Sequence, residues 1–315
     1  MKREGKFIFH VLAFMTMALW GVTFVATKTL INQGLTPAQI FTIRFVIAYL
    51  GLLAVCLIRG GRDKRAFSQS LRHELIFVVM GVTGGSLYFF TENTALRYTQ
   101  ACNVSFIVCM APLLTVLLTI SIKRLFKGSI ADGLEDVKLR FPLLAGTVLA
   151  LSGMVMVTFG DNALSLSPKG DILAFLAALC WALYSQFTGR MTDLYGTLFA
   201  TRKVFFYGLV TIIPVLLLTD NSNLATVAFR NVQVWGNLLF LSTIASLFCF
   251  VLWNRILVVI GNVTATNYVY LNPVFTLIGA VIILDESMTV LSAIGSAMIL
   301  GGVILAGAKR FIRTK

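Results

Sequence analysis

The chain contains few residues of the kinds that enzymes use for catalysis or metal binding. Only 12% of its 315 residues are charged, and its two histidines are His10 and His73. Its five cysteines lie within apolar segments and show no C-x-x-C spacing. Such a set indicates neither a disulfide framework nor a metal site. Scattered acids with two histidines do not form a catalytic set either, so we expect neither enzyme activity nor a cofactor.

Long apolar runs dominate the sequence. Apolar residues make up 58% of the chain and the mean hydropathy is +0.88, whereas charged residues alone approach about a quarter of a typical soluble protein. The runs are too long for transmembrane strands and have the length of spanning helices. The predicted spans are residues 8–30, 38–58, 75–96, 101–122, 141–159, 170–189, 198–218, 234–256, 263–284 and 289–308. The sequence predicts an all-α integral membrane protein with ten transmembrane helices.

The basic residues lie between the apolar runs. The net charge is +13, but its distribution among short connections favours a membrane protein over a nucleic-acid partner. Under the predicted topology, 19 Lys and Arg residues fall on one side of the bilayer and 3 on the other. Because cytoplasmic loops carry the excess of basic residues, both termini are predicted to lie in the cytoplasm.

The chain repeats itself at an offset of 161 residues. Trp20, Asn93, Pro112 and Thr115 correspond to Trp181, Asn254, Pro273 and Thr276. Near the repeat ends the offset is 149, which matches Gly146 with Gly295 and Gly153 with Gly302. Five spans per copy would make the second copy thread the membrane in the opposite sense, as in transporters with inverted repeats. We therefore predict two domains, residues 1–160 and residues 161–315, related by inverted topology.

The two matched prolines fall near the middle of their predicted spans. Pro112 and Pro273 each remove a backbone donor and free a carbonyl one turn earlier, near Val108 and Val269. Transporters place substrate sites at broken helices, although a kink that only improves packing is an equal alternative. Polar residues precede both prolines, and the candidates among them are Asn103, Asn267 and Tyr270.

Aromatic residues form a second candidate set. Trp20, Phe24 and Lys28 share one face of the first predicted span, and Trp181 and Tyr184 share one face of the sixth. Both tryptophans lie about 12 residues into their spans, deeper than the usual interfacial belt. They indicate either a cavity wall or simple packing between helices.

Three ionisable residues inside the predicted spans give the sharpest functional signal, because a charge within the bilayer normally faces protein or water. They are Lys28, Arg44 and Glu92, and their repeat counterparts are Gly189, Phe205 and Trp253. Glu92 shares a helix face with Gly81, Gly85 and Tyr88. We hypothesise that Glu92 pairs with Lys28 or Arg44 in at least one conformation. Alternatively, Lys28 snorkels to the surface and Arg44 belongs to a fixed ion pair.

Other charged and small residues have simpler interpretations. Arg202 and Lys203 are expected to snorkel at the end of the seventh span. Asp285 and Glu286 are expected to be helix-start acids before the tenth, with an external cation filter as the alternative. Glycines and alanines on the fifth and tenth spans predict close helix packing. That packing is either internal or between copies, so a monomer and a homodimer both stay open.

Several segments in this order resemble the EamA family of the drug/metabolite transporter superfamily. They are ALW before Gly21, FTIRF around Arg44, TALRYTQACNVSFIVCMAPLLT, its echo GNVTATNYVYLNPVFTLIG, Glu286 and the glycine-rich last span. The resemblance implies a ten-helix basket whose third, fourth, eighth and ninth helices line a cavity. It also implies moving first/second and sixth/seventh pairs, peripheral fifth and tenth helices, and a bacterial cytoplasmic (inner) membrane location.

The resemblance further implies a secondary transporter that exports amino acids or related metabolites by alternating access. An antiporter of organophosphates or nucleotide sugars, which relies on Lys and Arg in its cavity, is the first alternative. A membrane receptor that does not transport is the second. The expected partners are a small-molecule substrate and the lipid bilayer. Protons would be the coupling ion if Glu92 titrates, and facilitated diffusion or exchange is the alternative.

Overall fold

The computed structural model describes residues 3–59, 65–125, 141–160, 167–219, 231–260, 267–286 and 289–307, and contains helices but no strand within them. Its elements are α1 (Arg3–Asn32), α2 (Pro37–Arg59), α3 (Leu71–Gly81), η2 (Val82–Ser86), α4 (Leu87–Tyr98), α5 (Ala101–Val108), α6 (Ala111–Leu125), α7 (Phe141–Gly160), α8 (Pro168–Tyr195), α9 (Thr197–Thr219), α11 (Val232–Leu239), η3 (Phe240–Phe248), α12 (Cys249–Ile260), η4 (Asn267–Leu271), α14 (Asn272–Leu284) and α15 (Val290–Gly307).

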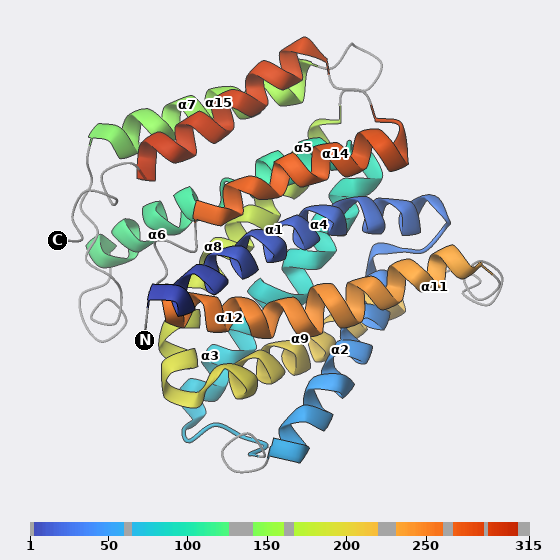
Figure 1. The fold of residues 1–315 in the computed structure, drawn as a ribbon, viewed down its shortest axis with the longest axis vertical. Coiled ribbons are helices and arrows are strands. Elements are labelled where there is room, and N and C mark those ends of the chain that lie inside the picture. Colours follow the sequence, from blue (N-terminus) through green and yellow to red (C-terminus); the bar gives the residue numbers. More distant parts are fainter. Residues whose placement is uncertain are drawn as a thin grey trace.

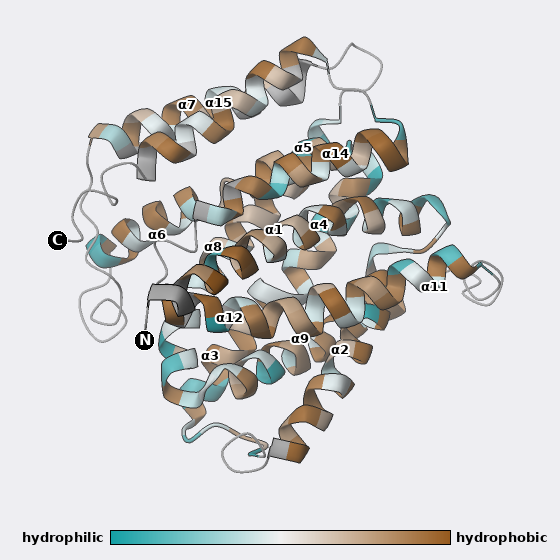
Figure 2. Cartoon of the chain, in the orientation of Figure 1, coloured by the Kyte–Doolittle hydropathy of each residue, from teal (hydrophilic) through white to brown (hydrophobic). Residues whose placement is uncertain are grey.

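Within the described residues, seven helical stretches are long and apolar enough to cross a membrane. Three shorter apolar helices, Leu144–Gly153, Asn272–Leu284 and Ala293–Gly302, lie within the predicted fifth, ninth and tenth spans. Hydrophobic colour predominates over the helices in Figure 2, and hydrophilic colour is concentrated near helix ends and on parts of α3, α4 and α11. The all-helical membrane architecture is therefore confirmed, whereas the count of ten spans stays a prediction.

Helix α1 runs through the middle of the molecule (Figure 1) and contacts α4, α5, α12 and α14. Its closest approach is to α14, where a Cβ on Gly21 would lie 2.6 Å from the Phe275 Cβ. The Thr276 hydroxyl donates to the Gly21 carbonyl at 2.9 Å. A separate core joins α2, α3, α8 and α9 through large buried side chains such as Phe41, Phe77 and Phe199.

Two segments widen from α-helix to π-helix at matching places in the two copies. The first is η2, which separates α3 from α4, and the second is η3, which separates α11 from α12. At an offset of 161, residues 82–86 correspond to residues 243–247, which lie inside η3. Each widened turn receives an aromatic side chain from the other copy: Trp20 donates to the Ala245 carbonyl at 3.0 Å, and the Tyr184 ring packs on Gly84. The apolar pattern of the sequence did not indicate these π-helical turns.

The helices break where the two prolines indicated. The α5 helix ends at Val108 and α6 begins at Ala111, with Pro112 in its first turn. The 3-10 segment η4 precedes α14, which has Pro273 in its first turn. The two breaks meet, because the Cys109 thiol donates to the Val269 carbonyl at 3.9 Å. Val269 is the residue whose carbonyl Pro273 was predicted to free.

Helices α7 and α15 form the most extensive helix pair of the described residues, and they lie side by side at the top of Figure 1. Their glycines make reciprocal contacts. A Cβ on Gly153 would lie 2.5 Å from the Gly295 carbonyl, and one on Gly302 would lie 2.5 Å from the Gly146 carbonyl. The two helices therefore run antiparallel, and the predicted close packing is confirmed as a contact within the chain.

Neighbouring glycines of α15 provide a matched test of this contact. A Cβ at Gly302 would clash with α7 backbone, whereas one at Gly301 would meet only the Leu149 side chain at 3.9 Å. We expect Gly302→Ala to lower stability by about 1–3 kcal/mol through overpacking. Gly301→Ala should gain up to about 1 kcal/mol from helix propensity. Thermal unfolding of the purified proteins in one detergent measures both, and equal melting temperatures would contradict the packing.

Candidate functional site

Arg44 of α2 is buried deep within the helices. Its side chain is 3% exposed, and its Nε donates to the Ser246 hydroxyl of η3 at 2.6 Å. The guanidinium carbon lies 4.7 Å from the ring centre of Phe89 and 5.4 Å from that of Phe45. Aromatic faces attract a cation, more strongly where water is excluded. The sequence therefore places a permanent positive charge in an aromatic setting between the two copies.

Glu92 of α4 supplies the opposite charge. Its side chain is also 3% exposed, and it interacts electrostatically with Arg44 and shares a hydrogen bond with Tyr88, one turn earlier on the helix. A buried carboxylate is costly unless a cation and hydrogen-bond donors balance it. Of the two cations hypothesised to pair with Glu92, Arg44 is the one that interacts with it electrostatically in this structure, and the pairing itself stays a prediction.

Aromatic rings join the predicted tryptophans to this pair. Tyr88 lies 5.1 Å from Trp181, measured between ring centres. Phe250 lies 5.4 Å from Trp20 and 6.4 Å from Trp181, so it bridges the two repeat-related tryptophans. Tyr184 follows at 5.3 Å from Trp181. We call Arg44, Glu92, Tyr88, Trp20, Trp181, Tyr184 and Ser246 the central cluster.

Lys28 lies elsewhere, at the corner between α4 and α5. Its ammonium donates to the carbonyls of Leu96 at 2.6 Å and Thr99 at 2.7 Å, at the C-terminal end of α4. Glu286 accepts from the backbone N–H of Ala101 at 2.9 Å, at the N-terminal end of α5, and interacts electrostatically with Lys28. A cation at a helix C-terminus and an anion at an N-terminus both complement the helix dipole.

We call Lys28 and Glu286 the corner clamp. It corrects one expectation, because Glu286 caps α5, not the tenth span, and it gives Lys28 two backbone carbonyls as acceptors. Asn103 belongs to the same corner, since its amide donates to the Thr99 hydroxyl at 3.3 Å. Phe24 is 2% exposed in an apolar core with Leu96, so it packs between helices. The side chains of Asn267 and Tyr270 lie outside the described residues.

A second clamp joins the first turn of α3 to the second and third turns of α9. Lys203 is 3% exposed and forms an ion pair with Glu74. The Glu74 carboxylate also accepts a hydrogen bond from the Tyr207 hydroxyl of α9. Arg202 is 5% exposed and donates to the Arg65 carbonyl. The expectation that both basic residues snorkel was therefore wrong. They are directed into the protein by carboxylate and carbonyl acceptors of the other copy, and we call Glu74, Lys203 and Tyr207 the end clamp.

Sequence reasoning did not identify the end clamp because its partners are far apart along the chain. The repeat itself held a signal: at an offset of 161, Glu74 corresponds to Trp235 and Lys203 to Thr42. The end clamp is thus confined to one end of the pseudosymmetric scaffold, in the same way that Arg44 and Glu92 are confined to one copy. Among the described residues, no group of three or more His, Cys, Asp or Glu residues is placed to hold a metal ion.

Comparisons with known proteins cover nearly the whole chain. The sequence profile described as the EamA-like transporter family matches residues 8–159 and 168–308. An uncharacterized transporter of Archaeoglobus fulgidus is 30% identical, with 96% of this chain and 98% of that protein covered. The uncharacterized inner membrane transporter YedA of Escherichia coli K12 is 23% identical, with 95% and 90% covered. One crystal structure shares the fold, with a TM-score of 0.64, 19% identity and 99% and 100% of the two chains covered.

The corner clamp predicts an unequal effect of two lysine substitutions. Lys28→Met removes a charged donor from two carbonyls, and hydrogen bonds to charged groups contribute about 1.5–3 kcal/mol each. We expect a clear fall in the melting temperature. Lys169→Met is the control, because Lys169 makes an exposed hydrogen bond to the Tyr98 hydroxyl at 3.0 Å, and exposed pairs add little. Equal melting temperatures for the two variants would show that Lys28 does not stabilise the corner.

Proposed function

The chain belongs to the EamA-like transporter family and is a membrane transporter, not an enzyme, and we propose that it carries a zwitterionic, amino-acid-like metabolite by alternating access. In this proposal the central cluster binds the substrate. The main observation in support is that the oppositely charged Arg44 and Glu92 are buried together among aromatic rings, where helices of the two copies contact each other.

We propose ten spans arranged as two inverted repeats, residues 1–160 and 161–315, with both termini in the cytoplasm. Three reciprocal features support this arrangement: the π-helical segments at matching positions, the crossed glycine contacts of α7 and α15, and the two proline breaks that meet. Inverted halves that exchange conformations convert a site open to one side into a site open to the other.

The chemistry of the central cluster favours a zwitterion. Arg44 provides a guanidinium for a carboxylate, and Glu92 provides a carboxylate for an ammonium group. Tyr88 and the two tryptophans provide faces for an apolar or aromatic side chain. The electrostatic interaction between Arg44 and Glu92 would be replaced by two ion pairs with the substrate, so no charge would be left uncompensated in the membrane.

An organophosphate or a nucleotide sugar fits less well. A phosphate bearing two negative charges calls for several cations, and Arg44 is already balanced by Glu92. Lys28, the other cation proposed for such a substrate, is held by the Leu96 and Thr99 carbonyls. We also propose that the direction of transport is export from the bacterial cytoplasm and that Glu92 couples it to protons. Flux measurements test both.

Counterflow in proteoliposomes tests the site. A panel of amino acids is first screened for thermal stabilisation of the protein, and the hits are then used as labelled substrates. We expect Arg44→Gln and Glu92→Gln each to reduce flux at least tenfold while the protein stays folded. The double variant should lose much less than the product of the single effects, because the two residues act as one unit.

Lys28→Met serves as the matched control in the same cycle. Because Lys28 lies at the corner clamp, away from Glu92, the two substitutions should act independently. The fold-loss of flux in the double variant Lys28→Met with Glu92→Gln should therefore equal the product of the two single fold-losses. Coupling of Glu92 to Lys28 and not to Arg44 would contradict the site. Flux that ignores an imposed pH gradient would exclude proton coupling while leaving the substrate site intact.

We further propose that the end clamp holds α3 and α9 together in one of the two access states. Glu74→Gln weakens the clamp and leaves Lys203 without its anionic partner, so the open state at this end should become more populated. Spin labels at the exposed Leu71 of α3 and Phe206 of α9 in a cysteine-free background report the separation of the two helices. We expect a second, longer distance in Glu74→Gln.

The charge-reversed pair Glu74→Lys with Lys203→Glu controls for this result. It preserves opposite charges at the two positions and should restore the shorter distance. A distance distribution that is the same in the parent and Glu74→Gln would rule out the end clamp as a gate.

A further inference from the structure

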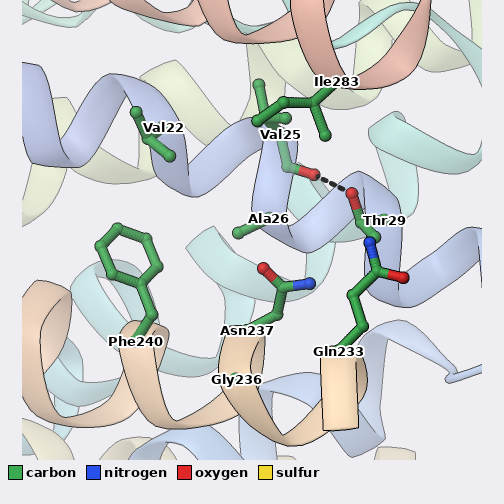
Figure 3. Close-up of a pocket in the computed structure, with 9 residues that line it drawn as sticks. All are labelled: Val22, Val25, Ala26, Thr29, Gln233, Gly236, Asn237, Phe240 and Ile283. Atoms are coloured by element: carbon green, nitrogen blue, oxygen red, sulfur yellow. Dashed lines mark hydrogen bonds between the residues drawn. The ribbon is translucent and has the colours of Figure 1, made fainter. Parts of the chain in front are cut away.

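A groove with a volume of about 350 Å³ lies on the side of α1 that faces away from the central cluster. Figure 3 shows its two principal walls, α1 and α11, with Ile283 of α14 above them. Val22, Ala26 and Thr29 line it from α1 at helical spacing. Val25 lines it as well, and on a helix wheel these residues lie on the face opposite Trp20. Since Ile283 is 53% exposed, the groove opens toward the surrounding lipid.

The groove changes from polar to apolar along its length. Thr29 and Gln233 lie near the ends of their helices, about 5 Å or less along the axis from Asn32 and Val232. Val22 lies about 15 Å from the end of α1, and it faces Phe240 across the groove. All the lining side chains are uncharged. This gradient follows that of a lipid, from its ester region to its acyl chain.

Asn237 carries the argument for a specific ligand. Its amide lies about 8 Å into α11 and is directed across the groove toward Ala26 (Figure 3). Within the described part of the chain, no protein group hydrogen-bonds this side-chain amide. A polar group at such depth is costly without a partner, because hydrocarbon supplies none. An ester carbonyl of a lipid is an acceptor found at this depth.

We propose that this groove binds one ester-linked acyl chain of a bilayer lipid, with the Asn237 amide donating to the ester carbonyl. The chain lies along Val22 and Phe240 and contacts α1 on the face opposite the central cluster. The lipid therefore packs against a helix whose other face carries Trp20. This site is additional to the proposed substrate site and does not depend on it.

Gly236 offers a way to fill the groove without disturbing the protein. It lines the groove, and a Cβ added to it would meet no atom within 4 Å. Gly189 of α8 is equally open and lies outside the groove, so Gly189→Leu is the matched control with the same gain in helix propensity. Native mass spectrometry after mild delipidation counts the retained molecules of diacyl phosphatidylethanolamine. We expect one fewer in Gly236→Leu than in the parent or Gly189→Leu.

The ester contact has its own test. Titration of the delipidated protein with diacyl phosphatidylethanolamine and with its dialkyl ether analogue compares lipids that differ in the carbonyl. One hydrogen bond corresponds to a preference on the order of 2- to 10-fold for the ester lipid. Asn237→Leu should abolish the preference and still bind the ether lipid. An equal affinity of the parent for both lipids, or an unchanged lipid count in Gly236→Leu, would overturn the proposal.

Discussion

The need to pair every buried charge is the constraint on which this structure depends. Hydrocarbon offers no hydrogen bonds, so a charged side chain within a span must find its partner in the protein. Arg44 finds Glu92 and Ser246, and Lys203 finds Glu74. Lys28 finds the backbone carbonyls at the end of α4. Each pairing joins helices that are distant in sequence, and together they determine which helices are neighbours.

Close approach of backbones makes these pairings possible. Glycine at position 81 lets α3 approach α9 near the end clamp, where a Cβ would lie 2.4 Å from the Tyr207 Cβ. The π-helical turns open carbonyls to side chains of the other copy, as Trp20 shows at Ala245. The scaffold is thus repeated in both copies, whereas the charges are not. The repeated parts would serve the motion, and the unrepeated charges would serve substrate recognition and gating.

The sequence predicted what depends on local pattern. Apolar length gave the helices, and the matched prolines located the breaks before Pro112 and Pro273. The rarity of charged residues within the spans singled out Arg44 and Glu92 as candidate site residues. The sequence could not show that Glu286 caps α5, because this contact joins residues 185 positions apart. The π-helical turns were missed for a related reason: apolar residues fit α- and π-helix alike, and tertiary contacts decide between them.

The glycine contact between α7 and α15 has a consequence for the energetics of transport. This pair contacts the remaining helices far less than its members contact each other. The helices that carry Arg44, Glu92 and both clamps can therefore rearrange while the α7–α15 interface is conserved. Its contribution to the free energy would then be the same in both states of the proposed alternating-access cycle and would cancel from the equilibrium between them. The most extensive helix pair of the described residues would therefore set the stability of the protein and not its rate of transport.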